Sequence, residues 1–526
     1  MKNLRLLPHV SMLVMISAAV ACSSAGAPQD AVQEEDPLTS ITARSRELTF
    51  DGVVYVAEGA SDAAVLAQVR RQTQTAFGAL RTSEIGVNSR ELKEVDPSKF
   101  RKKNVTLIDA TAAPRAMVEV TYTYTDNAVV PVSMARRSSL GSAVMGPDYA
   151  SQSDRILKEC TDNDQEARDF QGSIWYVFKP SLRSCGTAIS AEKTKISAAR
   201  TALKATKTQI VAEELNRLYL PTTVKLGADK TNKGETFPEY DRLYAGGVAP
   251  GKLVVSVLNG LIDHGEGTKW DDSGNFEWMS TLRQVFQARE GFKLVKTDPQ
   301  VDLSTFTLKS GKKITGLTFD DFMKWKLDFE SKAGLSRDEQ KELQTLVGDK
   351  LAGTWFTFES KVKVQVGSDA KKDLTLQLFT FYGAEHEGAP YKRGIKESDV
   401  FLYNGHSFIG FGPLDPKNFS KADFPSSYQI LFIDGCVSYN YYEKDYIPLK
   451  EGGIKNLDLI TNGLEAPSGD SGNALGKFIA ALWSGKQSSY KDLLSVASST
   501  DSLRVVDGEI GNVYTPTATP IVITGN

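Results

Sequence analysis

The chain has few of the residues that build metal centres, with only four histidines and four cysteines among 526 residues. Structural zinc sites and iron–sulfur clusters need clustered Cys or His ligands, so a protein with several such centres is excluded. A basic excess is also missing, because 62 Lys and Arg stand against 65 Asp and Glu, and no nucleic-acid partner is expected. Hydrophobic residues make up 41% of the chain, which is enough for large buried cores and predicts a multidomain globular protein.

The N-terminus has the order of regions found in export signals: basic residues, an apolar stretch, and small residues leading up to Cys22. Small residues before a Cys resemble the lipobox of bacterial lipoproteins, although Ala19 stands where that group usually has Leu. The resemblance implies a signal peptide over residues 1–21 and lipidation of Cys22. An ordinary secretory signal with an incidental Cys is the alternative. We expect a bacterial envelope protein held on the lipid bilayer by its acyl anchor. Ser23, in place of Asp, resembles the sorting pattern of outer-membrane lipoproteins, which implies the outer membrane.

The exported compartment permits disulfides because it is oxidising. Cys160 and Cys185 lie close in sequence on either side of an aromatic segment, and we pair them. This pairing leaves Cys436 as a single thiol, either buried and inert or reactive.

Changes in amino-acid composition and in the hydrophobic pattern divide the rest of the chain into segments. Residues 22–46 are rich in Ala, Ser, Gln and Glu and predict a flexible tether. Residues 47–187 combine strand and helix patterns in a small α+β domain. Residues 188–221 are rich in Ala, Lys and Glu and predict a long helical strut. Buried strand runs alternate with helices over 250–500, which predicts an α/β domain with a mainly parallel sheet flanked by helices.

Two shorter features complete this organisation. Alternating segments on either side of a Gly-Ser-Asp turn predict a hairpin insertion near 354–382, within the α/β domain. Residues 501–526 are interpreted as a C-terminal hairpin.

Two reactive side chains follow two of the buried strand runs. The run 399–403 leads into Asn-Gly-His406, and the run 428–433 leads into Asp-Gly-Cys436. If these strands are parallel neighbours, His406 and Cys436 lie side by side at the rim where open α/β sheets bind ligands. The imidazole would then lower the pKa of Cys436 and make it a thiolate nucleophile. The glycine before each residue would leave backbone amides available to hold an oxyanion.

The two blocks VFLYNGHS and ILFIDGC resemble the caspase-like cysteine peptidases, a group that includes caspases, legumain, clostripain, gingipains and separase. The resemblance covers 250–500 and implies a caspase-like fold acting on a protein or peptide substrate. It implies His406 as general base or acid, Cys436 as nucleophile, and the backbone amides of Ser407 and Cys436 as the oxyanion hole. Ser407 stands where the family usually has Gly, and Gly435 where several members have Ala. The alternative is a non-catalytic envelope lipoprotein whose caspase-like domain binds a protein or peptide partner.

Other polar clusters give weaker signals, and no cofactor is required. One acidic loop offers oxygen ligands for Ca²⁺, although spaced carboxylates more often belong to a solvated loop: Asp263, Glu266, Asp271 and Asp272. His264 is interpreted as a residue of that loop, and His386, between two glutamates, as part of a solvated turn. The run Ser468–Gly472 is similar to the GDSG of serine proteases, but its polar surroundings favour a turn. P-loop, HExxH and GxSxG motifs are missing.

Overall fold

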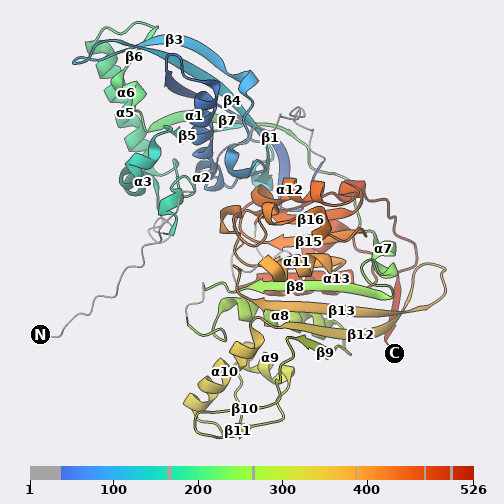
Figure 1. The fold of residues 1–526 in the computed structure, drawn as a ribbon. Coiled ribbons are helices and arrows are strands. Elements are labelled where there is room, and N and C mark those ends of the chain that lie inside the picture. The colour runs from blue at the N-terminus through green and yellow to red at the C-terminus, as the bar shows by residue number, and fades with distance from the viewer. Residues whose placement is uncertain are drawn as a thin grey trace, which may run out of the picture. The chain divides into compact units, whose positions relative to one another are not determined.

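Two large β-sheets organise the chain in the computed structural model, which describes residues 37–162, 169–263, 267–386, 388–466, 469–497 and 502–525 (Figure 1). Both sheets belong to one compact unit, residues 36–526. The predicted signal peptide and Cys22 lie outside the described residues, as do His264, Glu266 and Ser468. Within the described part of the chain, no helix is both long enough and apolar enough to span a bilayer.

The N-terminal sheet has the strand order β5–β7–β1–β4–β3–β6, with β2 also paired to β4. Its longest pairing joins β1 and β4 in antiparallel register from Ala43↔Pro131 to Ala57↔Met117. Apolar residues of α1 and α2, among them Val69 and Phe77, pack with the buried face of this sheet. Its elements are β1 (Ala43–Ala57), α1 (Asp62–Gln74), α2 (Ala76–Arg81), β2 (Gly86–Val87), β3 (Arg101–Ile108), β4 (Arg115–Pro131), β5 (Ser139–Met145), α3 (Ser153–Cys160), α5 (Arg183–Ala202), β6 (Gln209–Val211), α6 (Ala212–Leu215) and β7 (Tyr219–Asp229).

The predicted tether 22–46 is wrong for its last ten residues, and its earlier part lies outside the described residues. Leu38 is buried, Thr39 forms a bridge with Val506, and β1 begins at Ala43. The compositional bias toward small polar residues ends before these apolar positions, so residues 37–46 have enough apolar surface to join the fold.

The predicted strut 188–221 is also wrong beyond Ala202, where α5 ends. Lys204 adopts a left-handed conformation with φ 51°, and the chain then enters β6, which pairs with β3. The remainder of the predicted strut runs through α6 into β7, a strand of the N-terminal sheet. That sheet therefore extends well past the predicted domain boundary at residue 187.

The C-terminal sheet has five parallel strands at its centre, in the spatial order β13–β8–β14–β15–β16. Numbered along the chain, this order is 2-1-3-4-5, so the connections diverge from β8 and create a switch point between β8 and β14. The burial of nearly every residue in β8, β14, β15 and β16 agrees with the continuous apolar runs that predicted them. These strands are β8 (Lys252–Gly260), β13 (Lys372–Gly383), β14 (Val400–Asn404), β15 (Gln429–Asp434) and β16 (Leu457–Asn462).

The edges of this sheet are antiparallel, so the sheet is mixed rather than mainly parallel. β12 (Trp355–Gln365) and β13 form the predicted hairpin, but it is no insertion, because β13 pairs with β8 along nine residues. The predicted hairpin over 501–526 is wrong. β17 (Arg504–Asp507) pairs with β16, whereas β18 (Val522–Gly525) pairs with β12 at the opposite edge, beside β9 (Lys293–Asp298).

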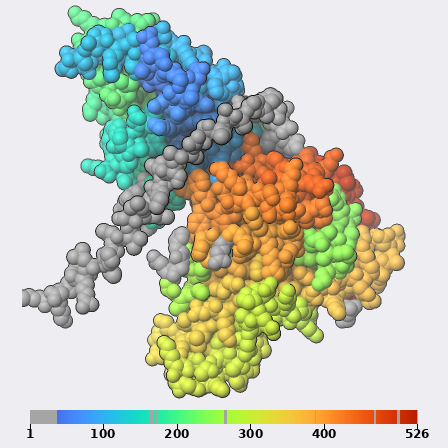
Figure 2. All heavy atoms as spheres, in the orientation of Figure 1, coloured from blue at the N-terminus to red at the C-terminus, as the bar shows by residue number. Residues whose placement is uncertain are grey.

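Helices cover both faces of the C-terminal sheet. One face packs against α8 and α13, as in the contact between Phe432 and Phe478. The other face packs against α11 and the N-terminal part, which is the N-terminal sheet with its helices, from Ala43 to Asp229. Residues 300–351, yellow-green to yellow in Figure 2, carry α9 and α10. They pack on α8, where the rings of Trp278 and Phe319 meet edge to face. The remaining elements are α7 (Tyr240–Ala245), α8 (Ser273–Ala288), β10 (Phe306–Thr307), β11 (Lys313–Ile314), α9 (Phe319–Leu327), α10 (Arg337–Leu351), α11 (Gly388–Lys396), α12 (Lys444–Tyr446), α13 (Ser471–Leu482) and α14 (Tyr490–Ala497).

Candidate active site

The two candidate reactive residues follow neighbouring parallel strands at matching positions. β14 pairs with β15 in a register that sets Asn404 opposite Asp434, so His406 and Cys436 each lie two residues past the last pair. The glycine before each of them is needed because the rim is crowded. A Cβ on Gly405 would lie 2.0 Å from Glu385 Oε1, and one on Gly435 would lie 2.5 Å from Ser407 Oγ. The expected adjacency of the two strands is therefore present.

His406 is held by its backbone and by its ring. Its backbone N–H donates to Glu385 Oε1 at 2.8 Å, and its carbonyl oxygen accepts from the Tyr403 hydroxyl at 2.8 Å. The ring nitrogen Nε2 lies 2.7 Å from the carbonyl oxygen of Ile262, which follows β8. A carbonyl oxygen can only accept, so Nε2 carries the hydrogen and Nδ1 is the basic nitrogen of the neutral ring.

Glu385, just past the end of β13, is the site residue that the sequence interpretation missed. It was assigned to a solvated turn around His386, yet only 5% of it is exposed. Burial raises the pKa of Glu385 to about 8, and the bonds from Tyr403 and the His406 amide reduce this rise without cancelling it. The single hydroxyl hydrogen of Tyr403 faces both Glu385 Oε1 and the His406 carbonyl oxygen, at 2.7 and 2.8 Å. A protonated Glu385 can donate to Tyr403 while Tyr403 donates to His406, which agrees with the raised pKa.

Cys436 is partly buried, and its thiol donates to the carbonyl oxygen of Ala466 at 3.9 Å. Burial raises the pKa of this thiol to about 11, and the carboxylates of Glu465 and Asp434 add to the rise, against a lowering effect from Arg81. The low-pKa thiolate expected from the sequence is therefore wrong for this conformation. The reason is that the thiol is desolvated beside two acidic side chains.

The backbone of both loops is strained. Ten described non-glycine residues have positive φ, and the only two β-branched ones among them are Ile409 at 52° and Val437 at 53°. One lies three residues after His406 and the other directly after Cys436. A β-branched side chain in this region costs free energy, and such outliers cluster at functional sites. Ser407 and Cys436, the expected oxyanion donors, stand next to these strained segments.

A row of buried polar side chains crosses the carboxyl ends of the parallel strands. The register aligns Asn259, Asn404 and Asp434, and Asn462 donates to Asp434 Oδ1 at 2.7 Å. Arg504 also donates to Asp434 Oδ1 at 2.7 Å, in an ion pair in which the Arg504 side chain is 9% exposed. The amide atoms of Asn259 and the Nδ2 of Asn404 have no partner among the described residues. The rim is thus polar and buried at the switch point, where ligands of such sheets bind.

The described carboxylates of the expected Ca²⁺ loop are engaged within the protein. Asp272 accepts from the backbone N–H groups of Ile262, Asp263 and Gly274 as it caps α8. Asp263 accepts from Ser273, and Asp271 from the hydroxyl of Thr268. Over the described residues, no group of three His, Cys, Asp or Glu side chains could hold a metal ion.

The Gly-Asp-Ser-Gly run leads into α13 and serves a structural purpose. The backbone N–H groups of Gly469 and Gly472 donate to the buried carboxylate of Glu277 on α8. Ser468 lies outside the described residues. This contact accounts for a glycine at residue 472, where a Cβ would lie 2.1 Å from the Glu277 carbonyl oxygen.

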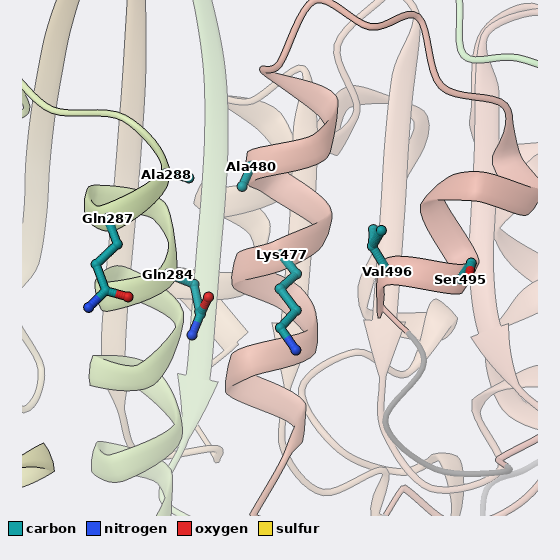
Figure 3. Close-up of a pocket in the computed structure, with 7 residues that line it drawn as sticks. All are labelled: Gln284, Gln287, Ala288, Lys477, Ala480, Ser495 and Val496. Carbon is teal, nitrogen blue, oxygen red and sulfur yellow. The ribbon is translucent and has the colours of Figure 1, made fainter.

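An open groove lies away from the candidate residues, between α8, α13 and α14 (Figure 3). Its lining is polar and aliphatic, and it contains neither of the candidate reactive residues: Gln284, Gln287, Ala288, Lys477, Ala480, Ser495 and Val496. Among its described lining residues the only titratable side chain is that of Lys477 and the only hydroxyl that of the exposed Ser495, so it offers no buried reactive group comparable to those at the strand-end rim.

Comparison with known proteins adds no assignment. No protein-family model matches the chain, and neither the curated proteins nor the solved structures contain a match.

Proposed function

We propose that this chain is a cysteine endopeptidase with a caspase-like domain, anchored in the bacterial cell envelope. The observation that carries the proposal is the register of β14 and β15, which sets His406 and Cys436 at equivalent positions on adjacent strand ends. The strained residues Ile409 and Val437 in the same two loops support it. The 2-1-3-4-5 order also supports it, because ligands of open α/β sheets bind at the switch-point rim.

The chemistry requires the Cys436 thiol to leave the Ala466 carbonyl and turn toward His406. Nδ1 of His406 then takes the thiol proton, and the thiolate attacks the carbonyl carbon of a peptide bond. The backbone amides of Ser407 and Cys436 would hold the developing oxyanion. The imidazolium returns its proton to the leaving amine, and water releases the acyl group from the sulfur. Glu385 and Tyr403 fix the backbone of His406 on both sides and so orient the base.

The test is labelling by a peptide that carries a thiol-reactive acyloxymethyl ketone, together with cleavage of a peptide library. Wild-type chain should be labelled at Cys436, and Cys436→Ala and His406→Ala should abolish cleavage. His386→Ala is the matched control, since His386 is not part of the proposed dyad. Equal cleavage by His406→Ala and the wild type would refute the assignment of the base.

A second function, binding of a protein or peptide partner without catalysis, is favoured by the thiol itself. Its pKa of about 11 and its bond to Ala466 describe an inert group. In this case Cys436→Ala would leave partner capture unchanged, and no peptide in the library would be cleaved.

The proposed location follows from the N-terminal sequence, in which small residues precede Cys22. Lipidation of Cys22 would hold the protein on the bilayer, in the outer membrane. Cys22→Ser should release the processed chain into the soluble fraction. A cleaved variant that still sediments with membranes would exclude the lipid anchor.

A further inference from the structure

The N-terminal part contacts each of the three loops that follow β14, β15 and β16. In the loop after β14, Asp415 accepts from Arg90 at 3.0 Å. In the loop after β15, Asn440 donates to the carbonyl oxygens of Val87 and Ser89 at 3.0 and 2.7 Å. In the loop after β16, the carboxylate of Glu465 pairs with Arg81. The loops at the candidate site are therefore packed against the N-terminal part.

Arg81, at the end of α2, is fixed by neighbours within the N-terminal part. Its guanidinium lies 4.2 Å from the centre of the Tyr176 ring, and its Nε donates to the Tyr176 carbonyl oxygen at 3.2 Å. The Arg81 side chain is 9% exposed, whereas that of Glu465 is 41% exposed. A desolvated guanidinium over an aromatic ring loses little further freedom when it binds a carboxylate. The pair is thus anchored from the N-terminal side.

Glu465 belongs to the four-residue segment Gly463–Ala466, which lies between the N-terminal part and Cys436. On one side, a Cβ on Gly86 would lie 2.4 Å from the Gly463 carbonyl oxygen. On the other side, the Ala466 carbonyl accepts from the Cys436 thiol, and the Leu464 carbonyl accepts from the Val437 N–H at 2.9 Å. The loop that carries the thiol is therefore tied, at Cys436 and Val437, to a segment that Arg81 contacts through Glu465.

We propose that Arg81, acting through Glu465, is a positioning residue that keeps the Gly463–Ala466 segment against Cys436 and so holds the thiol in an unreactive position. A thiol that donates to a backbone carbonyl cannot at the same time give its proton to His406. Gly463 and Leu464 also donate to the carbonyl oxygens of Leu503 and Ser502 within the C-terminal part, at 3.2 and 2.9 Å. Movement of the N-terminal part away from Glu465 therefore frees the second half of the segment, Glu465 and Ala466, and with it the thiol. The role rests on the proposed function in that Cys436 is the reactive group, but the test below measures thiol chemistry alone.

The test is the rate of iodoacetamide labelling of Cys436 in the full chain, measured by peptide mass spectrometry over a range of pH. Arg81→Gln should raise the rate roughly threefold to fivefold, because a thiol is a weaker donor than an N–H or O–H group and its bond to Ala466 is long. Electrostatics alone predicts the opposite sign, because the Arg81 charge lowers the pKa of Cys436 and its removal would slow labelling. The double variant Arg81→Glu with Glu465→Arg restores the pair in reverse and should return the rate toward that of the wild type.

Lys444→Gln is the matched control, since Lys444 pairs with Glu94 between the same two parts but away from the segment. Its labelling rate should stay within about twofold of the wild type, less than the worth of one hydrogen bond. An unchanged or slower rate in Arg81→Gln overturns the proposal. Glu465→Gln, at the more exposed partner, breaks the same pair if Arg81→Gln does not fold, and an unchanged rate there is equally decisive. Faster labelling without any peptide cleavage would keep the positioning role and remove the peptidase proposal.

Discussion

Replacement of Glu385 by Gln should make the protein more stable at neutral and alkaline pH. In the folded chain, burial raises the pKa of Glu385 from 4.5 to about 8. The folded state therefore binds this proton more tightly than the unfolded state does. The stabilisation is fully present below pH 4.5 and is lost as the pH rises through about 8. Gln keeps the neutral shape, can accept from the His406 amide, and has no proton to lose. Its NH2 takes the place of Glu385 Oε2, which has no partner among the described residues, and so adds a cost that does not vary with pH.

The size of this effect follows from the pKa difference. Each pKa unit corresponds to about 1.36 kcal/mol, so the full difference sets an upper limit of about 5 kcal/mol. Relaxation and water entry around the ionised carboxylate reduce this, as does the buried NH2 of Gln, and we expect a gain of about 1–3 kcal/mol for Glu385→Gln above pH 8. The gain should grow between about pH 4.5 and 8 and become constant above that.

Urea unfolding of the wild type and Glu385→Gln at intervals between pH 5 and 9 measures this gain directly. Other titrating groups contribute to both proteins and cancel in the difference. Asp399→Asn provides a comparison, because burial raises the pKa of Asp399 only to about 6 and its pH dependence should end there. A stability difference between wild type and Glu385→Gln that does not vary with pH would refute the assignment of a neutral, buried carboxyl beside His406.

Three further outcomes are expected. Iodoacetamide labelling of Cys436 should rise with an inflection near pH 11, and a plateau reached by pH 9 would contradict the buried thiol. Loss of the Cys160–Cys185 bond in the double Ser variant should lower the free energy of unfolding by about 3.5 kcal/mol in urea, and no change would show that the bridge does not restrict the unfolded chain. Val437→Gly should be about 1 kcal/mol more stable than Val437→Ala, because residue 437 has positive φ. If Val437→Ala were the more stable of the two, as at positions with negative φ, that conformation would be excluded.

The parts of the fold that the sequence predicted are those with a strong local pattern. Continuous apolar runs identified β8, β14 and β15, and the spacing of Cys160 and Cys185 predicted a disulfide that the structure confirms. The predicted element boundaries were wrong where pairing between distant strands overrode the local sequence pattern. Residues 209–211 continue a helical composition, yet they pair with β3, a partner far back along the chain.

The positions of the candidate site residues were predictable from the sequence, whereas the surroundings of their side chains were not. The Gly-His and Gly-Cys endings of two strand runs were enough to predict that His406 and Cys436 follow adjacent strands. The thiol's surroundings depend on Arg81 and Glu465, which no local pattern links to Cys436. Glu385 was misassigned for a similar reason, since its burial beside Tyr403 depends on packing between strand ends and not on its acidic neighbours in sequence.

The backbone geometry of the strand-end rim favours a reactive site, whereas its electrostatics favour an inert thiol. The Gly463–Ala466 segment links the two. Register, glycines and the strained Ile409 and Val437 suit a reactive site, whereas the raised pKa of Cys436 suits an inert thiol. Both the Ala466 carbonyl that binds the thiol and the Glu465 carboxylate that raises its pKa belong to this one segment. Displacement of the segment would remove the hydrogen bond and one of the two opposing charges together. A single movement would thus bring the electrostatics of Cys436 closer to what its backbone geometry already allows.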